Sequence, residues 1–224
     1  MTTQAVITID DGPSKAWQAR ANQLDNLGVK AIWFCTGQNL KERPNAAQEL
    51  IHRGHWIANH SHDHRAFSDI SEDQARHSLQ ETENHIKTIY EDTSTPRDHK
   101  LFRFPYGDRG EHHLERNQRI LSDLSFTDLL GPKISYNWWS EYGHDESQDT
   151  FWTFDPKEYR DITRDEIQQR INDADPDQGG SLQTTGSNDI ILLHDIPEHT
   201  DDFHYALKEL NKATDIVNPE TFLQ

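Results

Sequence analysis

Histidine and aspartate, two residue types that bind divalent metals, are concentrated in two short segments of the sequence. Residues 59–64 read Asn-His-Ser-His-Asp-His, and Asp10 and Asp11 are adjacent. His60 and His64 are spaced so that one helical turn would bring both imidazoles to the same side. A carboxylate from the aspartate pair would complete a set of three ligands. Two histidines and one carboxylate with an open position form a catalytic zinc arrangement, so the pattern predicts a catalytic metal site.

Two other polar residues, Arg103 and His194, could take part in acid–base chemistry at the same place. Arg103 can hold a carboxylate ionised and oriented. His194 could protonate a leaving group. Of the two adjacent aspartates, one can bind a metal while its neighbour stays free as a base, because their side chains point in different directions.

Short apolar segments alternate with helical ones and must position these residues. Strands are expected at residues 4–9, 30–35, 55–59, 101–104, 125–130, 151–154 and 189–193, and the main helices at 14–27, 44–53, 71–90 and 201–213. Polar surface loops are expected at 131–149 and 175–188. This alternation is typical of an α/β fold with a parallel sheet covered by helices. The chemistry of such folds collects at the carboxyl ends of the strands, where the metal-ligating and acid–base candidates lie.

Composition restricts the class of protein. The 224 residues carry a net charge of −17, which argues against a nucleic-acid partner and against attraction to anionic lipid. No apolar run approaches the roughly 18 residues of a membrane span. The single cysteine, Cys35, excludes an intramolecular disulfide and a multi-cysteine metal site.

The length and the N-terminus give further expectations. At about 150 residues per domain, we expect one domain over residues 1–224, and a monomer without nucleic-acid or membrane partners. Met1 stands just before the first predicted strand without a signal peptide. The sequence is therefore expected to be cytoplasmic or a piece trimmed from a secreted protein.

Four segments, in order, resemble motifs of the polysaccharide deacetylases, the NodB-homology or carbohydrate esterase family 4 group. They are residues 8–13 (TIDDGP), 59–64 (NHSHDH), 103–107 (RFPYG) and 191–195 (ILLHD). The match extends over most of the chain and is specific because the order of the motifs is kept. The resemblance implies a distorted (β/α) barrel of about seven parallel strands.

The resemblance also implies a ligand set and a base. Asp11, His60 and His64 would bind a divalent metal, usually Zn²⁺, with Co²⁺, Mn²⁺ or Ni²⁺ as alternatives. Asp10 would be the general base that activates the attacking water. His62, between the two ligand histidines, is expected to face away from this site.

Further roles follow from the same resemblance. His194 would protonate the departing amine, and Arg103 would orient the base. The backbone N–H of Tyr106, together with the metal, would stabilise the tetrahedral oxyanion. Leu192 would form the wall of the pocket that takes the acetyl methyl group, and Ser61 matches the small hydroxyl residue after the first metal histidine.

The sequence departs from the family at one motif, and its aromatic loop is open to two interpretations. The family often has Asp-x-x-Asp-Trp, where residues 155–159 read DPKEY. Glu158 would then replace the aspartate that tethers the acid histidine, and Tyr159 the tryptophan that lines the groove. Trp138 and Trp139 either contact sugar rings or form a small satellite core under residues 131–149.

The function expected from these residues is removal of acetyl groups from an N-acetylated glycan, such as chitin, chitooligosaccharides or peptidoglycan. O-deacetylation of acetylxylan and hydrolysis of a small amide or cyclic imide are alternatives that use the same site. A non-catalytic carbohydrate-binding module is disfavoured because Asp10 and His194 are both present. A non-haem iron oxygenase, which also uses two histidines and a carboxylate, is disfavoured because His199 and Asp201 have no suitable distant histidine after them.

Overall fold

A curved parallel sheet forms the centre of the molecule. The computed structural model describes residues 3–173, 182 and 186–224. Within them the strands are β1 (Gln4–Gly12), β2 (Ala31–Cys35), β3 (Trp56–Asn59), β4 (Asp189–His194) and β5 (Asp215–Ile216). The sheet order is β3-β2-β1-β4, with β5 pairing the start of β1, and all these pairs are parallel. The parallel α/β fold predicted from the sequence is therefore confirmed.

Two irregular segments continue the sheet from β3 round to β4. Asn59 forms a parallel bridge with Phe102, whose carbonyl accepts a hydrogen bond from the Thr150 N–H at 2.8 Å. Four residues after Thr150, Phe154 forms a parallel bridge with Ile191 of β4. In the described residues, four strands (β1 to β4) and these two irregular segments thus form a distorted, barrel-like ring, whereas β5 pairs with β1 outside this path.

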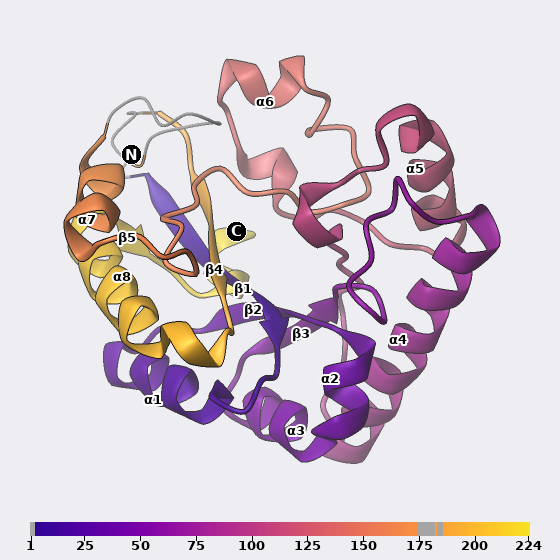
Figure 1. The fold of residues 1–224 in the computed structure, drawn as a ribbon, viewed down its shortest axis with the longest axis horizontal. Coiled ribbons are helices and arrows are strands. Elements are labelled where there is room, and N and C mark those ends of the chain that lie inside the picture. The colour runs from indigo at the N-terminus through magenta and orange to yellow at the C-terminus, as the bar shows by residue number, and fades with distance from the viewer. Residues whose placement is uncertain (1–2, 174–181, 183–185) are drawn as a thin grey trace.

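Helices surround this ring (Figure 1). They are α1 (Trp17–Leu27), α2 (Gly37–Glu42), α3 (Pro44–His52), α4 (Glu72–Thr93), α5 (Leu114–Asp123), α6 (Asn137–Glu141), α7 (Arg164–Asn172), α8 (Thr200–Ala213) and α9 (Pro219–Phe222). The longest, α4, begins with the capping box of Ser71 and Gln74, which satisfies backbone N–H groups at the helix start. Gly28 ends α1 with a φ of 69°, a left-handed conformation that glycine adopts without steric cost.

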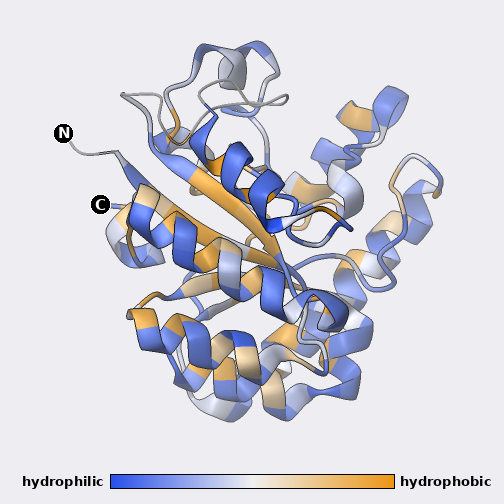
Figure 2. Cartoon of the chain, turned by 60° about the vertical axis from the view of Figure 1, so that its left-hand side comes forward, coloured by the Kyte–Doolittle hydropathy of each residue, from blue (hydrophilic) through white to orange (hydrophobic). Residues whose placement is uncertain are grey.

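The central strands are largely hydrophobic, whereas the surrounding helices carry both hydrophobic and hydrophilic residues (Figure 2). Ile7, Ile9 and Trp33 pack with the core residues of α1 and α8, whereas Val6 and Phe34, on the opposite face of the sheet, pack in a second cluster. This alternation follows the period of two along a strand. Among the described residues, no helix has the length and apolar character needed to cross a membrane.

Two expectations about local structure are wrong. Residues 125–130 form no strand, because Phe126 and Leu130 enter different apolar clusters and the backbone runs irregularly between them. Residues 131–149 are not simply a surface loop, since they include α6 and bury Trp139 completely. Most of the second expected loop, at 175–188, lies outside the described residues.

Candidate active site

The aspartate pair lies at the carboxyl end of β1, where the strand is irregular. The pairing of β1 with β2 shifts register between Asp10 and Gly12, and Asp11 has a φ of 67°. As a result, Asp10 Oδ2 and Asp11 Oδ1 each lie 3.6 Å from His60 Nε2. The irregular strand end lets two adjacent carboxylates reach one site, which a regular strand would place on opposite faces.

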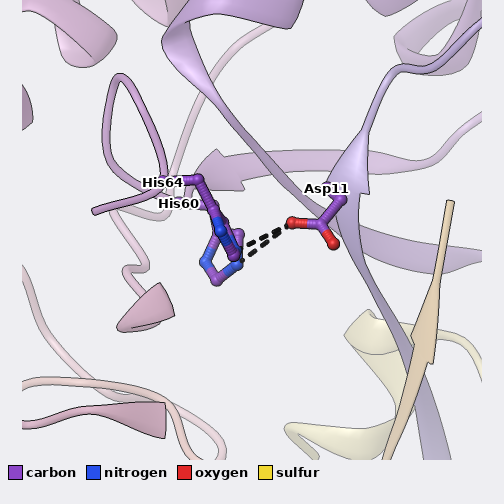
Figure 3. A group of neighbouring side chains, drawn as sticks. All are labelled: Asp11, His60 and His64. Atoms are coloured by element: carbon purple, nitrogen blue, oxygen red, sulfur yellow. Dashed lines mark ion pairs between the residues drawn. The ribbon is translucent and has the colours of Figure 1, made fainter. Parts of the chain in front are cut away.

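Asp11, His60 and His64 form a group that could hold a metal ion (Figure 3). Asp11 Oδ1 lies 3.6 Å from His60 Nε2 and 3.0 Å from His64 Nε2. Ligands bound at zinc–ligand distances of 2.0–2.2 Å in a tetrahedron lie about 3.3–3.6 Å apart, so the separation from His60 matches such an ion and the shorter one from His64, which is a hydrogen-bond distance, needs only a small shift. The donor set is also that of a site with an open position. The residues present therefore fit a divalent metal.

A backbone contact orients His60 as a ligand. Its Nδ1 lies 2.8 Å from the carbonyl oxygen of Arg103. A donated Nδ1–H at this carbonyl leaves the Nε2 lone pair directed toward Asp11, the arrangement that metal-ligating histidines usually have. Burial lowers the pKa of His60, which favours the neutral imidazole that binds metals.

The loop that carries the two histidines is not helical. Ser61 and His64 have φ values of 63° and 55°, in the left-handed region. The expectation of one helical turn between His60 and His64 is therefore wrong. The loop reverses direction after β3 and brings the imidazoles together, with ring centroids 4.9 Å apart.

Opposite charges collect around Asp11. Burial alone would raise the pKa of Asp11, but the hydrogen bond from His64 and the charges of His60 and His64 hold it well below its usual range. The Asp11 carboxylate is therefore ionised at neutral pH, as a metal ligand must be.

Arg103 is buried and holds the other aspartate. Its Nη1 donates to Asp10 Oδ1 at 2.9 Å and to Thr8 Oγ1 at 2.7 Å. Its Nε donates to the Thr150 carbonyl at 3.0 Å, and its guanidinium carbon lies 4.3 Å from the centroid of the Phe34 ring. These contacts fix one oxygen of Asp10 and leave Oδ2 on the side of His60.

His194 ends β4 and pairs in register with Asp10 of β1. Glu158, only 1% exposed, accepts a hydrogen bond from the His194 backbone N–H at 2.7 Å, and the same oxygen lies 3.5 Å from His194 Nδ1. Burial alone would lower the pKa of His194, but Glu158, with Asp10 and Asp11, raises it to about 9. The ring of Tyr159 lies 3.9 Å from that of His194. His194 is therefore held in the protonated form beside the aspartates.

These side chains line one cavity of about 360 Å³. Its walls are formed by Asp10, Asp11, His60, His64, Tyr106, Gly107, Trp152, Tyr159, Arg160, Leu192, His194 and Ile196. The carboxyl ends of β1, β3 and β4 thus meet at one opening. The cavity thus combines two carboxylates, two imidazoles that can bind a metal ion, and the imidazole of His194, which favours the protonated form. This combination suits hydrolysis of an acyl group.

The family follows from comparison with known sequences. The sequence model of the polysaccharide deacetylase family matches residues 2–124, more than half of the chain. The chain belongs to this family. It is similar to a peptidoglycan-N-acetylglucosamine deacetylase from Bacillus cereus, at 29% identity over 113 residues that cover 50% of the chain and 39% of that relative. It is also similar to chitin deacetylase 2 from Cryptococcus neoformans, at 27% identity over 191 residues.

Both relatives are much longer than this chain. The similarity to the chitin deacetylase covers 85% of the chain but 36% of the relative. The fold resembles a carbohydrate esterase family 4 pseudoenzyme from Bacillus anthracis, with a TM-score of 0.69 and 19% identity over the whole chain and 66% of the neighbour. At this identity the likeness shows the fold alone, so the individual site residues must carry any argument about activity.

The predicted aromatic contacts are only partly found in the cavity. Tyr106, 73% exposed, and Tyr159 line it, as does the buried Leu192. Trp139 is fully buried, so its position matches the second of the two interpretations, a packed core under residues 131–149. Trp138 packs against the same cluster and does not line the cavity, because α6 turns both indoles toward the core.

The site residues expected from the sequence do not include four residues of the cavity wall, which are Gly107, Trp152, Arg160 and Ile196. Trp152 lies beside Gly107, where a β-carbon would come within 2.6 Å of its ring. No spacing in the sequence distinguishes Trp152 from the other tryptophans. Ser61 is buried behind the metal-ligand group, with its N–H donating to Asn59 Oδ1 at 2.9 Å.

Proposed function

We propose that this chain is a metal-dependent deacetylase that hydrolyses the acetamide of N-acetylglucosamine units in a chitin-like or peptidoglycan-type glycan. The observation that supports it best is that Asp10 and His194, paired on adjacent strands, line the same cavity as Asp11, His60 and His64. A base, an acid and a metal-ligand group are thus all present. A degenerate binding module would not need to keep them together.

Asp11, His60 and His64 would hold the divalent metal. When bound, the metal makes water nucleophilic near neutral pH and polarises the acetyl carbonyl. Asp10 accepts the proton of the attacking water at Oδ2, while Arg103 holds Oδ1 and keeps the carboxylate oriented. The buried guanidinium of Arg103 stabilises the negative charge of this carboxylate.

The second half of the reaction uses the other side of the cavity. The backbone N–H of Tyr106 donates to the developing oxyanion of the acetyl group. His194 then gives its proton to the amine nitrogen as the carbon–nitrogen bond breaks, which yields acetate and a free amine. Glu158 holds the ring of His194 and favours its protonated form before this step.

The cavity wall suits an acetylated sugar. Leu192 offers an apolar surface to the acetyl methyl group, and the exposed ring of Tyr106 offers a flat face to a pyranose. The net charge of −17 repels polyanions, so a neutral glycan strand is favoured over a polymer rich in phosphate.

The test is acetate release from chitooligosaccharides, peptidoglycan and acetylxylan, each measured with added Zn²⁺ and with a chelator. We expect metal-dependent release from the N-acetylated substrates. Release of acetate from acetylxylan alone would favour the alternative of an O-deacetylase. Hydrolysis of small amides or cyclic imides alone would favour the alternative of a small-amide or imide hydrolase. No release from any of them by the Zn²⁺-loaded protein would contradict a hydrolytic function.

A further inference from the structure

A second group of metal-ligating side chains lies outside the cavity. His62, Glu81 and His85 each offer one ligand atom, and these atoms all lie within 4.8 Å of one another. His62 comes from the loop that carries His60 and His64, whereas Glu81 and His85 are on α4. Because they are four residues apart on a helix, Glu81 and His85 project from the same face.

The three side chains are partly buried and close in space. His62 Nε2 lies 3.5 Å from Glu81 Oε1, and the near-parallel rings of His62 and His85 have centroids 6.2 Å apart. His62 is 17% exposed and Glu81 33% exposed. Nε2 of His85 is shielded from solvent and has no hydrogen-bond partner in the part of the chain that the structure describes. A buried imidazole nitrogen without a partner is unfavourable, and a cation would supply one.

The position of His62 is fixed by its backbone. Its N–H donates to Ser78 Oγ of α4 at 2.8 Å, and its carbonyl accepts from the Gln38 N–H of α2 at 3.0 Å. At Gly37 a β-carbon would lie 2.4 Å from His62 Nδ1, so glycine is required for this close approach. With Nδ1 packed against Gly37, Nε2 is the nitrogen left to face Glu81. The imidazole is therefore held in place before any ligand binds.

We propose that His62, Glu81 and His85 bind a second divalent transition-metal ion, of the Zn²⁺ class. Two imidazoles and one carboxylate suit Zn²⁺, Co²⁺, Ni²⁺ or Cu²⁺ and not Mg²⁺ or Ca²⁺, which prefer oxygen ligands. His77 is one turn before Glu81 on α4, and its Nε2 lies 3.4 Å from Glu81 Oε2. This contact orients the carboxylate. The 3.5 Å between His62 Nε2 and Glu81 Oε1 already fits two ligands of one zinc ion, which lie about 3.3–3.6 Å apart.

The second ion would join two parts of the molecule that matter to the cavity. His62 stands between His60 and His64 in the chain, and α4 packs beside β3, from which this loop starts. An ion bound by His62 and by Glu81 and His85 of α4 fixes the loop on the side of α4. The first ion would be held by the same loop on the side of the cavity. The consequence is a site that stabilises the geometry of the catalytic ligands without touching substrate.

The test counts zinc ions by equilibrium dialysis against Zn²⁺ followed by elemental analysis. We expect two ions per wild-type chain and one in each of His85→Gln and Glu81→Gln. His112→Gln, which changes an exposed histidine elsewhere, is the matched control and should keep two. If His85→Gln and Glu81→Gln bind as many zinc ions as His112→Gln, the second site does not exist.

A second measurement separates this proposal from the proposed function. His60→Ala lacks a ligand of the first site, and we expect it to keep one ion and to gain thermal stability when Zn²⁺ is added. The double variant His60→Ala/His85→Gln should bind none and gain no stability. If Zn²⁺ stabilises both variants equally, His85 is no ligand and the second site is overturned, whatever the outcome for acetate release. Circular dichroism confirms that each variant is folded.

Discussion

Glu158 contacts His194 at two points, through a 2.7 Å hydrogen bond from the backbone N–H and at 3.5 Å from the imidazole Nδ1. One buried carboxylate therefore fixes both the end of β4 and the charge on the ring. The longer glutamate reaches the histidine at the position where the family often has aspartate. The departure from the motif thus still leaves a carboxylate in contact with the histidine that we propose as the acid.

Replacing Glu158 by glutamine should shift the pH dependence of turnover. The carboxylate favours imidazolium and raises the pKa of His194 to about 9, so its removal lowers this pKa. His194 must be protonated to act as the acid, and activity is lost as pH rises through its pKa. We therefore expect the alkaline limb of the kcat–pH profile to move to lower pH in Glu158→Gln. Glu146→Gln, at an exposed position, should leave the profile unchanged.

An unchanged alkaline limb in Glu158→Gln would show that this carboxylate does not control the acid. Fluorescence or circular dichroism melting distinguishes a shift in the profile from loss of folded enzyme. The comparison at saturating substrate matters, because kcat reports ionisation in the enzyme–substrate complex.

Asp10→Asn should lose turnover while it keeps the metal. The asparagine oxygen can still accept the hydrogen bond that Arg103 donates at 2.9 Å to Asp10 Oδ1, so the local structure survives. The amide cannot accept a proton from water, and loss of a general base typically reduces rate by about 10²–10⁴-fold. Acetate release and zinc content measured on the same sample test this. Wild-type acetate release by Asp10→Asn would remove Asp10 as the base.

His60→Ala and His64→Ala should each lose one zinc ion together with activity. Both imidazoles lie within 3.6 Å of Asp11 Oδ1, so either change leaves two of the three ligands. Zinc content and acetate release, with His52→Ala on the exposed end of α3 as a control, provide the check. Retention of the wild-type number of zinc ions in both variants would contradict the ligand assignment.

The sequence predicts which polar residues lie together at one edge of the sheet, because parallel strands impose a common geometry. Runs such as 30–35 and 189–193 are short, apolar and β-branched, and each forms a strand close to the expected bounds. Residues that directly follow parallel strands must meet at one edge of the sheet. For this reason Asp10, His60 and His194 could be placed together from their positions in the chain alone.

What the sequence does not predict depends on tertiary contacts. The positive φ of His64 arises in a loop held by α2 and α4, which no local pattern reveals. Residues 125–130 are apolar enough for a strand, but Thr127 makes a single backbone hydrogen bond to Lys100 and its neighbours fill separate clusters. Trp152 lines the cavity and Trp139 lies in the core, and no feature of the local sequence distinguishes these two environments.

Trp139 should contribute to stability and not to glycan binding. Its side chain is 0% exposed and packs against the rings of His144, at 4.7 Å, and Trp138, at 5.4 Å, between centroids. Truncating a buried tryptophan to alanine typically costs about 3–5 kcal/mol because a cavity remains. We expect Trp139→Ala to lower the free energy of unfolding in urea by this amount, and the milder Trp139→Phe to lower it less while KM for long chitooligosaccharides stays unchanged. In contrast, Trp152→Leu should raise that KM, since Trp152 lines the cavity. If Trp139→Phe instead raised KM more for long than for short oligomers and left the free energy of unfolding unchanged, Trp139 would contact the glycan.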